Sequence, residues 1–348
     1  MEFDIEDFDA LRHYLVQRGH IESGTTVFFK GLSGGVSNRT VRVSWADGHG
    51  WALKQALAKL RVEVDWFSSP ERIGVEAKAL RWLNHSAPPG TSPTFIFEDP
   101  AHHLMAMEAI PEDHENWKSV LLSGRIVPQH FEQFALLLGT IHRKSSEAGA
   151  KLSRTFADTT YFENLRLDPY YLYTASRVPV AAEFLTTLAQ ETLRHKNSLV
   201  HGDFSPKNTL LYRSKLILLD YEVFHFGDPA FDVGFALTHF LSKAHHLPNE
   251  RASLAGAAAL FWRTYSTQIA SLDWANALES RVVRHTLACL LARVDGKSPL
   301  EYLTPREVAR QREVVLRLIA HPPAHTNDLI AQFVQGISVQ DIGAYAEN

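Results

Sequence analysis

Segments that predict β-strands fill the first third of the chain. Residues 36–45 show the pattern most clearly, because Val41, Val43 and Trp45 alternate with polar residues. A period of two places alternate side chains on opposite faces of a strand. Asp47-Gly48, which follows, is typical of a hairpin turn. In all, strands are expected at residues 27–33, 36–45, 51–56, 94–98 and 103–107.

Helical spacing of apolar residues dominates the remainder of the chain. It occurs early at residues 5–20 and 70–86, and almost continuously after residue 111. The later helices are expected at residues 117–122, 128–145, 181–195, 231–244, 251–272, 274–294 and 305–320, with one more and a loose end in the last thirty residues. A chain of 348 residues can hold two domains. We expect one at residues 1–110 and another at 111–348.

One stretch, residues 199–232, contains most of the candidate chemistry. His201-Gly202-Asp203 is followed by Asn208, and the apolar run 216–219 ends at Asp220, with Glu222 two residues later. A short apolar run before an acid is typical of a buried strand. Because side chains alternate along a strand, Asp220 and Glu222 are expected on the same side of its end.

Phosphoryl transfer explains why these residue types occur in this order. The reaction needs a carboxylate for the acceptor hydroxyl and hard oxygen ligands for Mg²⁺. Asp203 suits the first role, Asn208 and Asp220 suit the second, and Glu222 is a candidate extra ligand. His201 is expected to order the loop rather than to transfer protons. The alternative is that His-Gly-Asp and Asn208 only form a polar turn between strands.

A glycine-rich loop and a lysine in the first lobe suggest a phosphate site. Glycines let backbone N–H groups approach an anion. The candidate phosphate-binding residues of this loop are Ser33, Gly34, Gly35 and Asn38. Lys54 lies on the next strand between apolar residues, and Glu76 of the following helix is its expected ion-pair partner, with Glu71 as a competitor. Alone, Lys54 could be an edge-strand charge and Glu76 part of a solvated helix face.

Composition excludes several classes of function. A formal net charge of -4 argues against a nucleic-acid binder. No stretch approaches 18 uncharged apolar residues, and the acidic N-terminus does not resemble a signal peptide, so neither membrane insertion nor secretion is expected. The single cysteine, Cys289, lies in an apolar run and is expected to be a buried thiol. One cysteine cannot form an intrachain disulfide, which suits a cytoplasmic location. The oligomeric state, including a homodimer, stays open.

The segments HGDFSPKN and LLDYEVFHFGDPAFDVG resemble the aminoglycoside phosphotransferase and choline kinase superfamily, most closely its methylthioribose kinase-like branch. This resemblance implies an α+β, bilobal protein-kinase-like fold, with a small antiparallel sheet and one main helix in the first lobe and a larger, mainly helical second lobe. It also implies ATP and Mg²⁺ as cofactors and a small-molecule hydroxyl acceptor. By resemblance, backbone groups from Glu108 to Ile110 bind adenine and Asp232 braces the catalytic loop. Asp232 could instead simply stabilise the N-terminus of its helix.

The resemblance is least specific where the acceptor binds. The aromatic segment 155–175 flanks the acceptor in the family, which makes Tyr170 and Tyr171 candidates; packing of an irregular loop is the alternative. Methylthioribose kinases carry twin arginines late in the chain, and Arg284 is the nearest match. Arg293 is a further basic candidate. Basic residues here favour a weakly polar or anionic sugar-like alcohol as the acceptor. The alternative is that they lie on solvated helix faces and bind nothing.

Several alternative functions stay open. The Pro-Lys-Asn ending of the catalytic loop is closer to aminoglycoside and choline kinases than to methylthioribose kinases, so aminoglycoside and choline- or homoserine-type kinases are alternatives. A nucleotide-binding pseudokinase would have lost at least one of its catalytic residues, yet Lys54, Asp203, Asn208 and Asp220 are all present. A protein kinase is disfavoured because Asp-Phe-Gly is absent and too few residues separate Asp220 from Asp232 for an activation segment.

Overall fold

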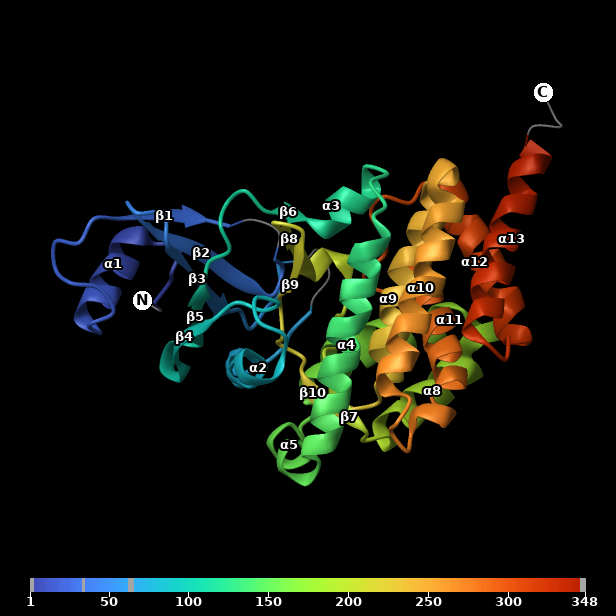
Figure 1. The fold of residues 1–348 in the computed structure, drawn as a ribbon, viewed down its shortest axis with the longest axis horizontal. Coiled ribbons are helices and arrows are strands. Elements are labelled where there is room, and N and C mark those ends of the chain that lie inside the picture. Colours follow the sequence, from blue (N-terminus) through green and yellow to red (C-terminus); the bar gives the residue numbers. More distant parts are fainter. Residues whose placement is uncertain (1–2, 33–34, 62–65, 345–348) are drawn as a thin grey trace. The chain divides into compact units, whose positions relative to one another are not determined.

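The computed structural model describes residues 3–32, 35–61 and 66–344 (Figure 1). The chain divides into two compact units, Met1–His114 with Ile217–Val223, and Glu115–Leu216 with Phe224–Asn348. The segment 217–223, which we expected in the second lobe, therefore belongs with the first unit. Side chains of this segment bond to that unit, and the Leu218 N–H also donates to the Thr91 carbonyl over 2.8 Å.

An antiparallel sheet forms the centre of the first unit. The order of its five described strands is β1-β2-β3-β5-β4. Their bounds are Val27–Gly31 (β1), Asn38–Trp45 (β2), Gly50–Ala56 (β3), Phe95–Asp99 (β4) and Leu104–Glu108 (β5). Two helices accompany the sheet, α1 (Phe8–Gln17) and α2 (Arg72–Ser86). The strands and helices predicted for this part of the sequence are confirmed, with ends that differ by a few residues.

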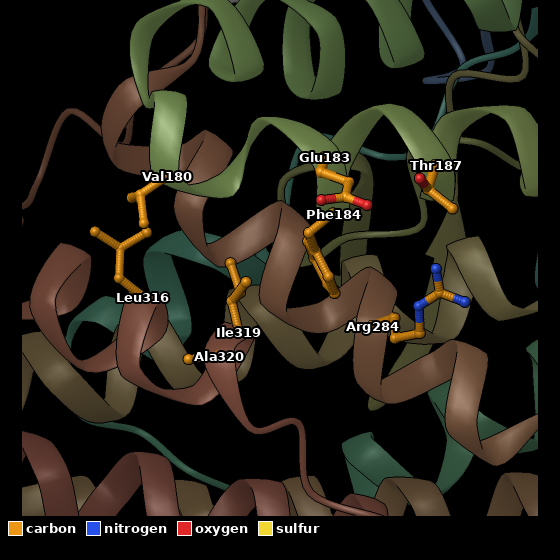
Figure 2. Close-up of a pocket in the computed structure, with 8 residues that line it drawn as sticks. All are labelled: Val180, Glu183, Phe184, Thr187, Arg284, Leu316, Ile319 and Ala320. Atoms are coloured by element: carbon orange, nitrogen blue, oxygen red, sulfur yellow. The ribbon is translucent and has the colours of Figure 1, made fainter.

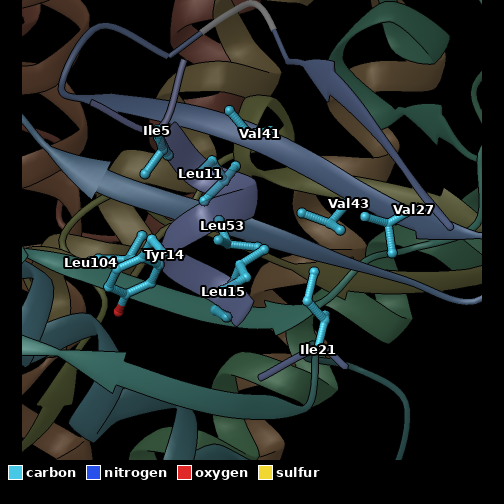
Figure 3. Packing of buried hydrophobic residues seen from close by; sticks show 11 residues of the cluster. Ile5, Leu11, Tyr14, Leu15, Ile21, Val27, Val41, Val43, Leu53 and Leu104 are labelled. Atoms are coloured by element: carbon cyan, nitrogen blue, oxygen red, sulfur yellow. The ribbon is translucent and has the colours of Figure 1, made fainter. Parts of the chain in front are cut away.

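Helix α1 packs on one face of this sheet. Leu11 and Leu15 of the helix contact a cluster that includes Val41, Val43 and Leu53 from the strands (Figure 3). The Asp7 side chain caps the helix by accepting a hydrogen bond from the Ala10 N–H. Because side chains alternate along a strand, the burial of Leu53 under α1 turns its neighbours on β3, including Lys54, to the opposite face.

Helices make up most of the second unit (Figure 1). Their bounds are Trp117–Leu122 (α3), Pro128–Ala148 (α4), Ala150–Thr155 (α5), Thr160–Phe162 (α6), Tyr173–Arg177 (α7), Ala182–Arg194 (α8), Ala230–His246 (α9), Arg251–Ile269 (α10), Glu279–Asp295 (α11), Pro305–Ala320 (α12) and Thr326–Ala344 (α13). Short strands complete it, namely Glu115–Asn116 (β6), Ser198–Val200 (β7), Thr209–Tyr212 (β8), Lys215–Leu218 (β9), which continues into the first unit, and His225–Gly227 (β10).

The aromatic segment is helical, which the sequence did not predict. Residues Glu163–Leu172 form a π-helix between α6 and α7, although Pro169 lies inside it. Phe162 stacks on His225, and Tyr171 is fully buried. Aromatic packing on the surrounding helices therefore stabilises a conformation that local sequence preferences would not favour.

Helix α9 is the buried centre of the second unit and packs against both α10 and α11. Residues 230–245 are all buried, so polar as well as apolar side chains of this helix face protein. Gly234 lets α11 approach closely, because a Cβ atom at this position would lie 2.6 Å from the His285 Cβ. No helix among residues 3–32, 35–61 and 66–344 is both long and apolar enough to cross a bilayer.

We predict that Gly234→Ala destabilises the protein by about 1–3 kcal/mol, because the added methyl group overpacks the contact between α9 and α11. Gly256→Ala in α10 is the matched control, since a Cβ atom there has nothing within 4 Å. It should be neutral or stabilising by up to about 1 kcal/mol. Urea denaturation of both variants measures the difference, and equal midpoints would contradict the packing account.

Candidate active site

A buried ionic network in the first unit contains three of the predicted site residues. Lys54 Nζ lies 2.6 Å from Glu76 Oε1 and 2.9 Å from Asp220 Oδ1. The ion pair predicted between Lys54 and Glu76 is therefore present. Burial by itself lowers the pKa of Lys54, but the Asp220 and Glu76 carboxylates outweigh it and raise that pKa above its ordinary value. Lys54 therefore remains an ammonium group in this network.

Asp220 lies two residues after the end of β9 and has an unusual backbone conformation. Its φ is 70°, in the left-handed region that non-glycine residues seldom adopt. Aspartate tolerates this region better than most residues. In this conformation the Asp220 carboxylate reaches Lys54. Its side chain is 25% exposed, whereas that of Glu76 is fully buried. Of the two carboxylates, Asp220 is therefore the one that borders solvent.

Glu222 is engaged by protein side chains. Its Oε2 accepts hydrogen bonds from Arg72 Nε over 2.9 Å and from Asn38 Nδ2 over 3.3 Å. Arg72 is fully buried and also donates to the carbonyl groups of Ser37 and Leu57. The network thus joins α2, the start of β2 and the segment after β9. These contacts turn Glu222 toward Arg72, and its predicted role as an extra metal ligand stays a prediction.

In the second unit, Asp232 organises the predicted catalytic loop. Its two carboxylate oxygens accept hydrogen bonds from the backbone N–H groups of His201 (2.7 Å) and Gly202 (2.8 Å). His142 lies 3.2 Å from the same carboxylate. Burial alone would raise the pKa of Asp232, but these donors hold it below its ordinary value. The structure thus has the bracing contacts that the resemblance implied for Asp232.

Hydrogen bonds within the loop 201–208 orient Asp203 and Asn208. The Asp203 N–H donates to His201 Nδ1 over 3.1 Å, and Asn208 Nδ2 donates to the Asp203 carbonyl over 3.1 Å. This second bond uses the amide nitrogen of Asn208 and leaves Oδ1 as its ligating atom. Asp203 Oδ2 accepts a 2.7 Å hydrogen bond from Arg166 Nη2. Asp203 Oδ1 accepts no hydrogen bond from the described residues, so it is the oxygen suited to an acceptor hydroxyl.

Of the remaining predicted nucleotide contacts, Glu108 and Asn38 lie at the ends of strands. Glu108 ends β5, its N–H bonds to the Thr94 carbonyl, and the Ile110 carbonyl accepts from Arg42 over 2.7 Å. The structure thus places these backbone groups but does not test their role. Ser33 and Gly34 lie outside the described residues. Gly35 precedes Asn38, which begins β2.

The four candidate acceptor residues lie in three different places in the second unit. Tyr171 is buried, and its hydroxyl lies 2.6 Å from His285 Nδ1. Arg284 pairs with Glu191 over 2.5 Å and lines a groove of about 390 Å³ between α8, α11 and α12, beside Phe184 (Figure 2). Tyr170 and Arg293 lie together elsewhere, with the guanidinium carbon 4.8 Å from the ring centroid.

Three contact residues of the site carry no recognisable signal in the sequence. Arg166 comes from the π-helix, Arg72 from the first turn of α2, and His142 from the middle of α4. Each contacts a residue that is far away along the chain, and none belongs to a recognisable sequence motif. A helical polar residue among apolar neighbours was the only hint, and it fits many ordinary buried polar groups equally well.

A second buried acid, Asp228, fixes the start of α9. Arg281 Nε donates to its carboxylate over 2.8 Å, and His285 Nε2 lies 3.9 Å away. Burial raises the pKa of Asp228, but His285 and Arg281 outweigh it and lower that pKa from 3.8 to about 2. The ionised form is therefore stabilised by folding. This contribution is complete above about pH 5 and is lost as the pH falls through 2.

We predict that Asp228→Asn lowers the free energy of unfolding at pH 7 by about 3 kcal/mol, because Arg281 loses a buried partner. Between pH 5 and pH 2 this deficit should shrink by about 2 kcal/mol, since wild-type Asp228 becomes protonated there. Denaturant titrations of both proteins across this pH range measure the deficit. A deficit that stays constant with pH would show that the Asp228 charge does not stabilise the fold.

Comparison with known proteins identifies the family. Residues 29–267 match the phosphotransferase enzyme family, which is more than half of the chain. The methylthioribose kinase of Pectobacterium atrosepticum is 24% identical over 273 residues, which cover 68% of each chain. That of Klebsiella pneumoniae subsp. pneumoniae is 25% identical over 234 residues, 60% of this chain and 58% of the relative. For the Klebsiella enzyme, the match therefore spans less than two thirds of the relative's length.

A solved structure of amicoumacin kinase, in complex with AMP-PNP and Ca²⁺, has the same fold. It superposes with a TM-score of 0.59 over 91% of this chain and 96% of that chain, at 16% sequence identity. The predicted α+β kinase-like fold and the resemblance to the methylthioribose kinase-like branch are thus confirmed. The chain belongs to the phosphotransferase enzyme family and is a phosphotransferase of the small-molecule kinase type.

Proposed function

We propose that this enzyme transfers the γ-phosphoryl group of ATP to a hydroxyl of a small sugar-like or other alcohol, with Mg²⁺ as cofactor. The observation that carries the proposal is the buried network of Lys54, Glu76 and Asp220. Kinases of this fold need a lysine held by a glutamate to fix the nucleotide phosphates, and an aspartate at the metal. A surface ion pair would not keep three ionisable groups together at this degree of burial.

In the proposed reaction Asp203 receives the acceptor hydroxyl. Its Oδ1 accepts the hydroxyl hydrogen bond while Arg166 holds Oδ2. The acceptor oxygen forms a bond to the γ-phosphorus, the bond from that phosphorus to the β,γ-bridging oxygen breaks, and the hydroxyl proton passes to Asp203. ADP and the phosphate ester leave. Holding the carboxylate in one orientation contributes to rate because positioning dominates phosphoryl transfer.

The residues present fit a magnesium ion. The Asn208 amide nitrogen donates to the Asp203 carbonyl, which leaves Oδ1 of Asn208 as a ligand. Asp220 offers a carboxylate. Hard oxygen donors of this kind are those that Mg²⁺ prefers. From their order in the sequence we propose Asn208 and Asp220 as its ligands, with Glu222 positioned by Arg72. When bound, the ion neutralises phosphate charge.

The nucleotide contacts and the cellular location are further proposals. We propose Lys54 and the glycine-rich loop as phosphate contacts and the Glu108–Ile110 backbone as the adenine contact. We also propose a cytoplasmic location, because the single cysteine, Cys289, is buried and burial raises the pKa of its thiol to about 12. A thiol of this kind is unreactive and fits a reducing compartment.

We predict that ADP release from Mg²⁺-ATP occurs with one member of a panel of small alcohols, and that Asp203→Asn lowers kcat about 10³-fold. The panel contains methylthioribose, other pentoses, choline, homoserine, fructosamines and aminoglycosides, together with the anionic alcohols D-glycerate and glycerol 3-phosphate. Asp203→Asn preserves size but cannot take the proton. Its nucleotide affinity should be unchanged, whereas Lys54→Met should weaken nucleotide binding.

The outcomes separate the alternatives. Turnover of an aminoglycoside or of choline would select one of the other kinase classes. Nucleotide binding without turnover of any acceptor, together with an Asp203→Asn variant indistinguishable from wild type, would favour a pseudokinase. A chain that does not bind Mg²⁺-ATP in calorimetry would contradict the proposal altogether.

A further inference from the structure

Two buried cations of the second unit have no acidic partner. Arg293 of α11 is 7% exposed, and Lys243 of α9 is fully buried. Lys243 Nζ donates to the His239 carbonyl over 3.3 Å, and Arg293 Nη1 donates to the Ser298 carbonyl over 2.8 Å. Neither pairs with a carboxylate in the part of the chain that the structure describes. Buried cations are normally paired, so these two require an explanation.

These cations belong to a larger group that we call the basic cluster, formed by Lys118, His239, Lys243 and Arg293 with the rings of Tyr170 and Tyr302. Arg293 Nη2 lies 3.2 Å from His239 Nε2, and its guanidinium carbon lies 4.8 Å from the Tyr170 ring centroid. Lys243 and Lys118 lie over the Tyr302 ring, at 5.4 and 5.9 Å. The aromatic rings partly compensate the charges but carry no negative charge themselves.

No carboxylate among the described residues pairs with Lys243 or Arg293 of the cluster. Burial, followed by the charges of Lys118 and Arg293, lowers the pKa of Lys243 to about 7. Burial, followed by Arg293 and Lys243, holds the pKa of His239 well below its ordinary value. The acid that acts on Lys243 is Glu301, which pairs with Lys118 and has a side chain 66% exposed. An added anion would favour the charged form of Lys243 and would pair with Arg293.

Two donors of the cluster also have no hydrogen-bond acceptor. Arg293 Nε and the Tyr302 hydroxyl are buried and have no partner among the described residues. Buried polar atoms are rarely left in this way, and each such case calls for a missing partner. A carboxylate or phosphate oxygen would accept from both and would at the same time neutralise the cations.

The basic cluster adjoins the catalytic loop. Tyr170, whose ring lies 4.8 Å from the Arg293 guanidinium carbon, belongs to the same π-helix as Arg166, four residues earlier. Arg166 is the residue that holds Asp203, at 2.7 Å. Lys207 of the same loop adds to the positive field at His239. A molecule bound at the cluster could therefore reach Asp203 with a neighbouring group.

We propose that the acceptor is an anion, a small alcohol that also carries a carboxylate or a phosphate group, and that Arg293, Lys243 and Tyr302 bind this group while its hydroxyl meets Asp203. This inference rests on the proposed kinase function and specifies its substrate class. It separates the two basic candidates on α11, because Arg293 binds the anion whereas Arg284, paired with Glu191, does not. A polycation or a quaternary ammonium alcohol would be repelled.

Calorimetric titration of the full chain with D-glycerate, glycerol 3-phosphate and glycerol tests the proposal, with Mg²⁺-AMP-PNP present to fill the nucleotide site. We expect millimolar or tighter binding of at least one anion and none of glycerol, and the two anions distinguish carboxylate from phosphate. Lys243→Met should weaken anion binding about tenfold or more. Arg284→Met, the matched change outside the cluster, should leave it unchanged.

A purely structural role predicts other results. If Lys243 only stabilises the last turn of α9, Lys243→Met changes thermal stability but not anion affinity, and the proposal fails. Tyr302→Phe removes only the buried hydroxyl and keeps the ring, so it tests the site even if Lys243→Met does not fold. Anion affinity unchanged in Tyr302→Phe and Lys243→Met, or absent in wild type, would overturn the inference.

The same experiment distinguishes failure of the anionic-acceptor proposal from failure of the proposed kinase function. If Mg²⁺-ATP binds and a neutral alcohol is phosphorylated while neither anion binds, the anionic acceptor is wrong and the kinase function stands. If Mg²⁺-AMP-PNP does not bind at all, the kinase function itself is wrong.

Discussion

The ammonium group of Lys54, held between the carboxylates of Glu76 and Asp220, is the interaction on which the first unit depends. One cation serves two acids that come from α2 and from the segment after β9. Removing Lys54 would leave the two carboxylates without a cation, which is costly in a medium of low dielectric constant. The need to bring both carboxylates to Lys54 explains three features together. They are the face of β3 on which Lys54 lies, the positive φ of Asp220, and the inclusion of residues 217–223 in this unit.

The second unit uses buried acids in a comparable way. Asp232 accepts backbone N–H groups of the catalytic loop, and Asp228 fixes the start of the same helix through Arg281. Both acids sit at the beginning of α9, the most completely buried helix of the described chain. The loop that carries Asp203 is therefore oriented by the centre of the unit and not by its surface. The basic cluster farther along α9 differs, because Lys243 and Arg293 pair with no carboxylate among the described residues.

Sequence patterns predicted most elements and the site residues that are close together along the chain. The period of two predicted the strands of the sheet correctly. The spacing of His201, Asp203 and Asn208 singled out a loop whose hydrogen bonds are local, and its catalytic role stays a prediction. The π-helix was missed since aromatic packing overrides the presence of Pro169. Arg166 and Arg72 were missed for another reason: each contacts a residue distant in sequence, and no local spacing records such a contact. Likewise, the sequence could not distinguish Arg284 from Arg293, which only their partners separate.

The central proposal is that Lys54, Glu76 and Asp220 form the phosphate and metal site of a kinase, with Asn208 assigned as a second metal ligand from its place in the sequence. A crystal structure of the chain with Mg²⁺ and AMP-PNP tests this most directly. The account predicts the phosphates in contact with Lys54 Nζ and the Mg²⁺ ion bound by Asn208 Oδ1 and an Asp220 oxygen. A nucleotide bound elsewhere, or an ion that is coordinated by neither Asn208 nor Asp220, would contradict it.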